Sequence, residues 1–191
     1  MATSPVAGQF PSIDKDSYRE VLTRFATGVT VVTTVEDGAG GPLPWGTTVN
    51  SFTAISLEPP LVMVSIGRER SIHPIIERTN RFGVNILGEG SQALSDCFAG
   101  APSASPREAF CNAEYSLGDA GLPVLEAAIA FLCAEVEQRI EAGDHTMYLG
   151  RVIETGCRDE TGWPLLYFRR RYLRIERAAT PDLRGKPDSL R

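Results

Sequence analysis

The chain has 191 residues, of which 42% are hydrophobic and 23% charged, and its formal net charge at pH 7 is −5. This composition is typical of one globular domain and excludes wholesale disorder, a collagen and a long coiled coil. The acidic balance argues against nucleic acid as the main partner, because phosphate binding usually needs a basic face. The basic run Arg169–Arg171 is interpreted as a solvated strand edge or a set of ion-pair donors. No apolar run approaches the ~20 residues of a membrane helix, so no membrane contact is expected.

The four cysteines, Cys97, Cys111, Cys133 and Cys157, form no C-x-x-C pair, and the chain has only two histidines. A zinc ribbon, a thioredoxin motif or another His/Cys metal site is therefore not expected. Free thiols in a reducing cytoplasm are the plain interpretation. The residues before Asp16 lack the basic and apolar segments of a signal peptide, which also favours a cytoplasmic location.

Taken in chain order, the sequence predicts a flexible segment at 1–13, one domain at 14–176 and a flexible tail at 177–191. A helix is expected from Asp14 or Asp16 to Phe25, and Gly28 follows as a stop. Two further short helices are expected over 71–79 and 91–98, and 101–123 is a loop-rich stretch. The strand patterns fall at 29–35, 47–51, 54–57, 61–66, 82–86, 128–140, 145–155, 165–168 and 172–175. Many strands and few helices predict a mainly β fold, a closed or nearly closed barrel of about eight strands.

The chain lacks three common nucleotide and nucleophile motifs. It has no G-x-G-x-x-G after a strand, no P-loop and no G-x-S-x-G elbow. Any role for an imidazole therefore falls on His73 or His145.

The stretch 45–62 is strand-like but carries an unusual density of small polar residues. Hydroxyls and an amide at Thr47, Thr48, Asn50 and Ser51 alternate poorly with the apolar residues. Such a stretch suits a flat heteroaromatic ligand with donors and acceptors at its rim, such as a flavin. A polar edge strand accounts for the same pattern equally well.

A second signal lies at 65–73, where a strand ends in a glycine turn with Arg68 and Arg70 and a helix is expected to begin at Ser71. A helix N-terminus offers free N–H groups and a partial positive charge, and hence a phosphate site. Arg68 would add a charge-assisted contact. An ordinary helix cap with solvated arginines is the alternative.

The chain resembles the short-chain flavin reductases, which supply reduced flavin to two-component monooxygenases. The resemblance rests on RFATGVTVVTT at 24–34, NSFTAISLEPPLV at 50–62, FGVNIL at 82–87, GDH at 143–145 and PLLYFR at 164–169. These stretches follow one another in the order of that family and span about residues 18 to 175.

The resemblance implies a flavin-reductase-like split β-barrel that binds FMN or FAD, acts as a homodimer and passes reduced flavin to a partner monooxygenase. It implies a hydride transfer from NADH to the flavin, with His145 of the Gly143-Asp144-His145 motif beside the nicotinamide. Backbone N–H groups of 46–51 would stabilise the reduced ring. The flavin contacts that it implies are Pro44, Trp45, Gly46, Thr47, Thr48, Asn50, Ser51, Ser65, Ile66, Gly67, Ser71, Ile72, Cys97 and Phe98. The expected cofactor-binding residues also include Arg68, from the phosphate signal above, and Asp144 and His145 of the Gly-Asp-His motif.

Two choices of cofactor stay open at this point. The Cys97-Phe98 pair resembles the adenine contact of FAD-using members and favours FAD over FMN. No arginine cluster for a 2′-phosphate is evident, which favours NADH over NADPH.

The chain departs from the family at Arg170, where a glycine usually follows the Phe-Arg pair. Either the backbone there is regular or Arg170 is strained. His73 is given a packing or flavin-shielding role, and His145 has packing on Tyr148 as its alternative. Other functional classes on a similar barrel are a self-sufficient flavin oxidase, a non-catalytic flavin-binding protein and a haem protein with His73 or His145 as axial ligand.

Overall fold

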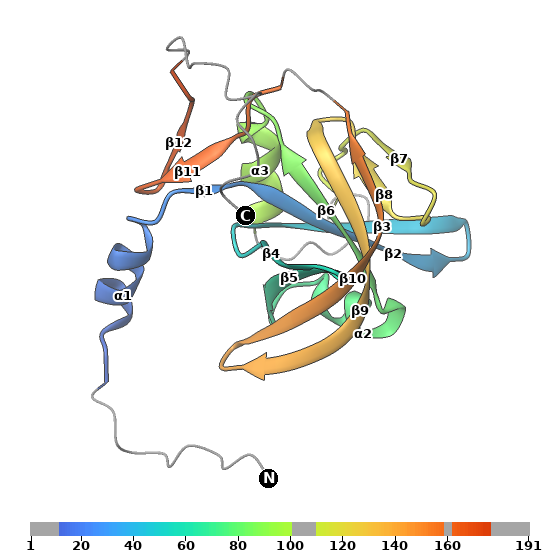
Figure 1. Ribbon diagram of the computed structural model, residues 1–191, viewed down its shortest axis with the longest axis horizontal. Coiled ribbons are helices and arrows are strands. Elements are labelled where there is room, and N and C mark those ends of the chain that lie inside the picture. Colours follow the sequence, from blue (N-terminus) through green and yellow to red (C-terminus); the bar gives the residue numbers. More distant parts are fainter. Residues whose placement is uncertain (1–11, 101–109, 159–161, 177–191) are drawn as a thin grey trace.

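The computed structural model describes residues 12–100, 110–158 and 162–176. Its centre is a seven-stranded sheet in which every neighbouring pair is antiparallel (Figure 1). In spatial order the strands are β3 (Gly41–Val49), β2 (Thr30–Gly38), β6 (Arg81–Leu87), β9 (Ala128–Ala142), β10 (His145–Cys157), β5 (Pro60–Gly67) and β4 (Thr53–Leu57).

Smaller elements surround this sheet. One small sheet holds β1 (Thr27–Gly28), β11 (Leu166–Phe168) and β12 (Arg171–Leu173), and another holds β7 (Tyr115–Leu117) and β8 (Pro123–Leu125). The helices of the described part are α1 (Lys15–Leu22), α2 (His73–Thr79) and α3 (Gln92–Ala99). None of them is long and apolar enough to cross a membrane.

The large sheet curls around an apolar interior, and a hydroxyl links its two ends. Ser51, just after β3, donates from Oγ to the carbonyl of Ser65 at 2.9 Å and accepts the Ser65 N–H at 3.1 Å. Side chains fill the space inside, among them the fully buried Val64, Phe82 and Tyr148. The predicted mainly β split barrel is confirmed, and a flat ligand has to bind outside it.

A second apolar cluster lies on the outside of the curled sheet, where it supports α3. Phe98 of α3 packs edge to face on Phe110, with ring centroids 5.3 Å apart, and both rings are buried. Val31, Leu125 and Leu165 belong to the same cluster. It fixes α3 beside β3 and the C-terminal strands.

The helix boundaries differ from those predicted at two ends. Asp14 caps α1 by accepting the N–H of Ser17 at 2.9 Å, but α1 ends at Leu22 and Phe25 lies beyond it. The second helix begins at His73, not Ser71, so that Pro74 falls among the first two helical positions, where proline is favoured because its missing N–H would have no partner within the helix. As predicted, the isoleucines at 72, 75 and 76 point into the core.

The prediction that all four cysteines are free thiols is wrong for the oxidised protein that the structure describes, because Cys97 and Cys111 form a disulfide there. The packing of Phe98 on Phe110 sets the neighbouring cysteines against each other, with their Cα atoms 6.0 Å apart. Cys133 and Cys157 are free. The flexible ends predicted at 1–13 and 177–191 fall outside the described residues, apart from residues 12 and 13, and the domain bounds stay a prediction.

Candidate functional site

Three neighbouring cavities on the outside of the barrel meet at Asn50. We call them the strand cavity, the hairpin cavity and the helix cavity, with volumes of about 380, 630 and 430 Å³. The strand cavity lies among β3, β5 and the start of β10. The hairpin cavity lies between α3 and the β11–β12 hairpin, and the helix cavity lies between α1 and that hairpin. Because Asn50 lines all three, we refer to the three cavities together as the groove, and their size is suitable for a dinucleotide.

The strand cavity brings together most of the predicted binding residues from three distant stretches of the chain. Strand register explains this, because His145 pairs with Gly67 and the Arg68 N–H donates to the Asp144 carbonyl at 3.0 Å. The turn before His145 needs Gly143, whose φ of +63° is a left-handed conformation. The predicted residues that line this cavity are Thr47, Thr48, Asn50, Ser51, Ser65, Ile66, Gly67, Asp144 and His145.

His145 is the one imidazole that lines the groove, and its neighbour Asp144 orients it. Its Nδ1 lies 2.7 Å from Asp144 Oδ1, and its side chain is 45% exposed. This hydrogen bond holds the pKa of Asp144 below its ordinary value, so the carboxylate stays ionised. The Nε2 atom is thereby left for a ligand. It is His73, not His145, that packs near Tyr148, with ring centroids 5.9 Å apart.

The hydroxyls of Thr48 and Ser51 in the strand cavity already make hydrogen bonds within the fold, whereas the Asn50 side chain does not. Thr48 Oγ1 donates to the Ser95 carbonyl at 2.8 Å and so joins β3 to α3. Ser51 Oγ is held by Ser65 at the opening of the barrel. The Asn50 side chain is exposed, borders all three cavities and makes no hydrogen bond within the described residues. Its amide is therefore the polar group best placed to meet a ligand.

Three predicted residues of β3 lie away from the groove. Pro44 borders a separate small cavity beside Phe110. Trp45 packs against the barrel interior, and its Nε1 donates to Glu36 at 2.8 Å. Gly46 lies under Phe98, where an added Cβ would be 2.5 Å from the ring. Of the three, only Gly46 packs against α3.

The remaining predicted residues also lie outside the three cavities. Arg68 binds the Gly143 carbonyl and pairs with Glu141 at 3.8 Å. Ser71 precedes the actual helix start, and Ile72 is fully buried. Cys97 is tied up in the disulfide, and Phe98 is buried beneath β3. A phosphate role at 71–72 therefore gains no support from the geometry.

The sequence reasoning missed the wall formed by α3 and the β11–β12 hairpin. The Tyr172 hydroxyl lies 2.9 Å from Ser95 Oγ and 2.7 Å from Asp96 Oδ1, so it fastens the hairpin to α3. In the sequence, the one signal for this wall is that Tyr167 and Tyr172 lie on either side of the arginine run. The unpredicted residues that line the hairpin cavity are Val29, Val49, Gln92, Ser95, Asp96, Ala99, Tyr167, Arg170, Arg171 and Tyr172.

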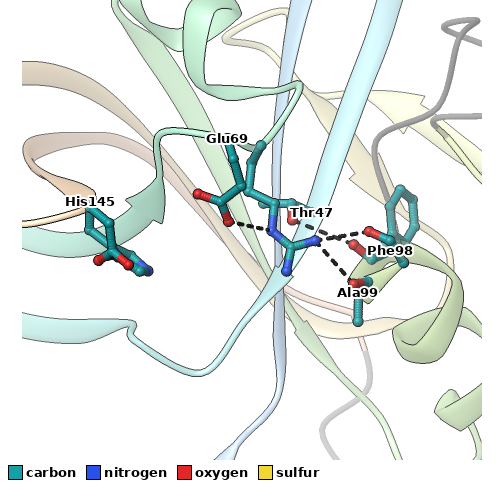
Figure 2. Close-up of polar contacts among 8 residues, drawn as sticks. Thr47, Glu69, Phe98, Ala99 and His145 are labelled. Atoms are coloured by element: carbon teal, nitrogen blue, oxygen red, sulfur yellow. Dashed lines mark hydrogen bonds and ion pairs between the residues drawn. The ribbon is translucent and has the colours of Figure 1, made fainter. Parts of the chain in front are cut away.

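Arg70 connects the turn after β5 to the end of α3. Its Nη1 donates to the carbonyls of Ala99 and Gly100 at 3.0 and 2.9 Å, and its Nε lies 3.6 Å from Glu69 (Figure 2). A cation at a helix C-terminus is favourable, since the last carbonyls carry partial negative charge. Arg70 thus joins the turn after β5, which borders the strand cavity, to the end of α3.

The departure at Arg170 proves to be strain. Arg169 and Arg170 both have positive φ, +50° and +60°. The regular alternative is therefore excluded.

Residues 22–176 match the family described as the flavin reductase like domain. The NADH-dependent flavin reductase StyB of Pseudomonas fluorescens is 39% identical over 84% of this chain and 89% of its own length. The reductase component of a Rhodococcus opacus 4-nitrophenol monooxygenase is 34% identical over 84% and 80%. The solved Streptomyces globisporus NADH:FAD oxidoreductase SgcE6 has a TM-score of 0.77 at 32% identity, over 90% of this chain and 99% of its own. The names agree with the predicted reaction and cofactors, and the chain belongs to the flavin reductase like family.

Proposed function

We propose that this protein reduces FAD or FMN with NADH and releases the reduced flavin to a partner flavin-dependent monooxygenase. The observation that carries the proposal is the strand cavity, where His145 lines the same space as the end of β3. The relatives support it, because StyB is named an NADH-dependent flavin reductase and the R. opacus protein a monooxygenase reductase component.

The chain contributes mainly by placing two flat rings against each other. Bound flavin supplies the hydride-accepting chemistry, and the residues supply position. Strand β3 is at one edge of the large sheet, so alternate backbone N–H groups of 46–49 point away from β2. These donors and the Asn50 amide hold the ring and stabilise the negative charge that reduction places on it.

His145 acts as a positioning group for the nicotinamide. Asp144 fixes the imidazole through Nδ1, which leaves Nε2 to hold the carboxamide of NADH. No proton needs to pass through His145. His73 is not placed to serve as an axial haem ligand, because it lines none of the three cavities and its Nε2 lies 2.9 Å from Thr146 Oγ1.

Two substitutions test this assignment together. His145→Ala removes a contact to NADH and lowers kcat/KM for NADH roughly 5- to 150-fold, the equivalent of ~1–3 kcal/mol, while the KM for flavin changes much less. Asn50→Ala raises the KM for flavin first. Each variant is the control for the other, and both Michaelis constants are measured in each. A His145→Ala enzyme with unchanged NADH kinetics would contradict the assignment.

We also propose a homodimer in which the second copy covers α1. None of the residues of α1 is buried: Tyr18 and Val21 are 57% and 68% exposed, and Phe25, just after the helix, is 75% exposed. In Figure 1 this helix stands apart from the large sheet. Because α1 also lines the helix cavity, the dimer would complete one wall of the groove. Val21→Glu should lower the sedimenting mass to that of a monomer and reduce activity, whereas a fully active wild-type monomer would refute the dimer.

The cytoplasm is the proposed location, since the reductant NADH is available there. The Cys97–Cys111 disulfide is then expected to be reduced in growing cells and oxidised after purification. Trapping thiols with an alkylating mass tag during lysis measures its state.

A further inference from the structure

The two residues that connect β11 to β12 have a backbone that arginine rarely adopts. Phe168 pairs with Arg171, so Arg169 and Arg170 alone form the turn, and both have positive φ. Two-residue hairpin turns of this kind normally carry Asn-Gly or Gly-Gly, because a Cβ disfavours the left-handed conformation. A turn with two arginines at positive φ is strained, and such strain is often found where a side chain has a functional role.

Contacts on both sides hold this turn in place. The Arg169 N–H donates to the Thr23 carbonyl at 2.8 Å, and the Arg169 guanidinium lies 5.2 Å from the Phe168 ring centre. Arg170 is the residue of the turn that lines the hairpin cavity and the helix cavity at once. The turn therefore projects one fixed arginine to the junction of the two cavities.

Arg170 and Arg171 differ from the other arginines of the groove in the polar contacts that their side chains make. Arg19 lies 3.5 Å from Asp16, and Arg70 donates to two carbonyls of α3. Arg170 and Arg171 make no side-chain hydrogen bond or ion pair within the described residues. The carboxylates around this wall have other partners: Asp96 is bound by the Tyr172 hydroxyl, Asp16 lies beside Arg19, and Glu20 pairs with Arg24. Arg24 is the main cause of the lowered pKa of Glu20, and Arg170 adds a smaller attraction. This end of the groove therefore has two uncommitted cations.

We propose that Arg170, assisted by Arg171, binds a phosphate group of a dinucleotide substrate, and so replaces residues 68–72 as the main anion subsite. The inference rests on the proposed function, whose two substrates NADH and FAD both carry a pyrophosphate. Guanidinium groups suit phosphate because their planar N–H groups form paired hydrogen bonds with its oxygens. The strained turn restricts where the arginine can reach, which reduces the ordering cost of binding.

Arg170→Gly tests this role, because it removes the cation and relieves the backbone at the same time. The variant should melt about 2–4 °C higher than wild type, since glycine accepts positive φ and each ~1 kcal/mol shifts Tm by that much in a chain of this size. Its KM for the phosphate-bearing substrate should rise roughly 5- to 20-fold with a nearly unchanged kcat, allowing for solvent exposure. That KM should also depend less on NaCl concentration.

Arg169→Gly is the matched control, since it relieves the same strain but removes a side chain that lines neither cavity. It should leave every KM within twofold of wild type. Arg170→Lys keeps the charge and should restore part of the lost affinity, although it is as strained as wild type.

The choice of substrate identifies the source of the phosphate. If the KM for NADH rises with either FAD or FMN as acceptor, the subsite holds the NADH pyrophosphate. If the KM for FAD rises and that for NADH does not, it holds the flavin pyrophosphate. Unchanged constants for both in Arg170→Gly, or an equal rise in Arg169→Gly, would overturn the proposal. Neither result would touch the proposed function, which fails only if the wild-type protein does not reduce flavin.

Discussion

Removal of the Ser51 hydroxyl should weaken the fold more than it weakens flavin contacts. In Ser51→Ala, the N–H and the carbonyl of Ser65 both lose the partner that now lies at 3.1 and 2.9 Å. Unpaired, partly buried polar groups of this kind cost ~1–3 kcal/mol in total. A loss of ~2 kcal/mol corresponds to a Tm lower by about 4–8 °C for a chain of this length.

Thermal unfolding followed by circular dichroism measures this loss, and flavin titration measures binding separately. Thr53→Ala is the control, because the Thr53 hydroxyl is exposed and its one hydrogen bond among the described residues, to the Ala54 carbonyl, is long at 3.4 Å. It should change Tm by less than ~1 °C. If Ser51→Ala keeps the wild-type Tm yet binds flavin more weakly, Ser51 is a ligand residue and its role at the barrel opening is wrong.

Other predictions concern the cysteines and the seat of α3. Replacing Cys97 and Cys111 by serine, or reducing their disulfide, should lower the free energy of unfolding by ~3 kcal/mol, because the bond closes a loop with a sequence separation of 14. Urea unfolding with and without reductant measures this change, and identical midpoints would argue against the bond. In the native oxidised protein, a thiol reagent at pH 8 should modify Cys157 but not Cys133, since burial and the nearby Glu154 raise the pKa of Cys133 to about 12; rapid modification of both would show that Cys133 is accessible. Gly46→Ala should cost ~1–3 kcal/mol through overpacking against a buried ring, and a wild-type urea midpoint would show that α3 moves freely.

Local patterns predicted those parts of the fold that depend on local physics. Alternating residues placed β6 and the long β9–β10 hairpin, whose turn lies at Gly143 as expected. Asp14 was one of two candidate caps for α1, and it is the one that accepts the Ser17 N–H. The polar stretch after Thr47 does line a groove, as its mixed composition indicated.

Contacts between distant segments could not be predicted in this way. Nothing near Ser51 in the sequence indicates that its hydroxyl joins Ser65, because that bond depends on how far the sheet curls. Trp45 was assigned to the flavin, but its packing in the barrel and its bond to Glu36 turn it inward. The Cys97–Cys111 pair has no spacing motif and depends on the packing of two phenylalanines.

The arginine run at the β11–β12 hairpin shows the same limit. Composition alone favoured a solvated edge, and no phosphate-binding arginine cluster was evident in the sequence. The fold brings Arg170 and Arg171 to the hairpin cavity together with Tyr172, far along the chain from Asn50. That wall exists only because the fold places the β11–β12 hairpin beside α3, which the sequence does not indicate.

The central claim is that flavin is a diffusing substrate of an NADH-dependent reductase, and one measurement tests it most directly. Purified protein is desalted, and NADH oxidation in air is followed at 340 nm with increasing free FAD. We expect the protein to lose flavin on desalting, as micromolar affinity of about −8 kcal/mol implies. It should then oxidise many equivalents of NADH at a rate that saturates with added FAD. Flavin retained stoichiometrically with a rate independent of added FAD would show a self-sufficient flavoenzyme, and oxidation that stops after one equivalent would show a storage protein; either result contradicts the account.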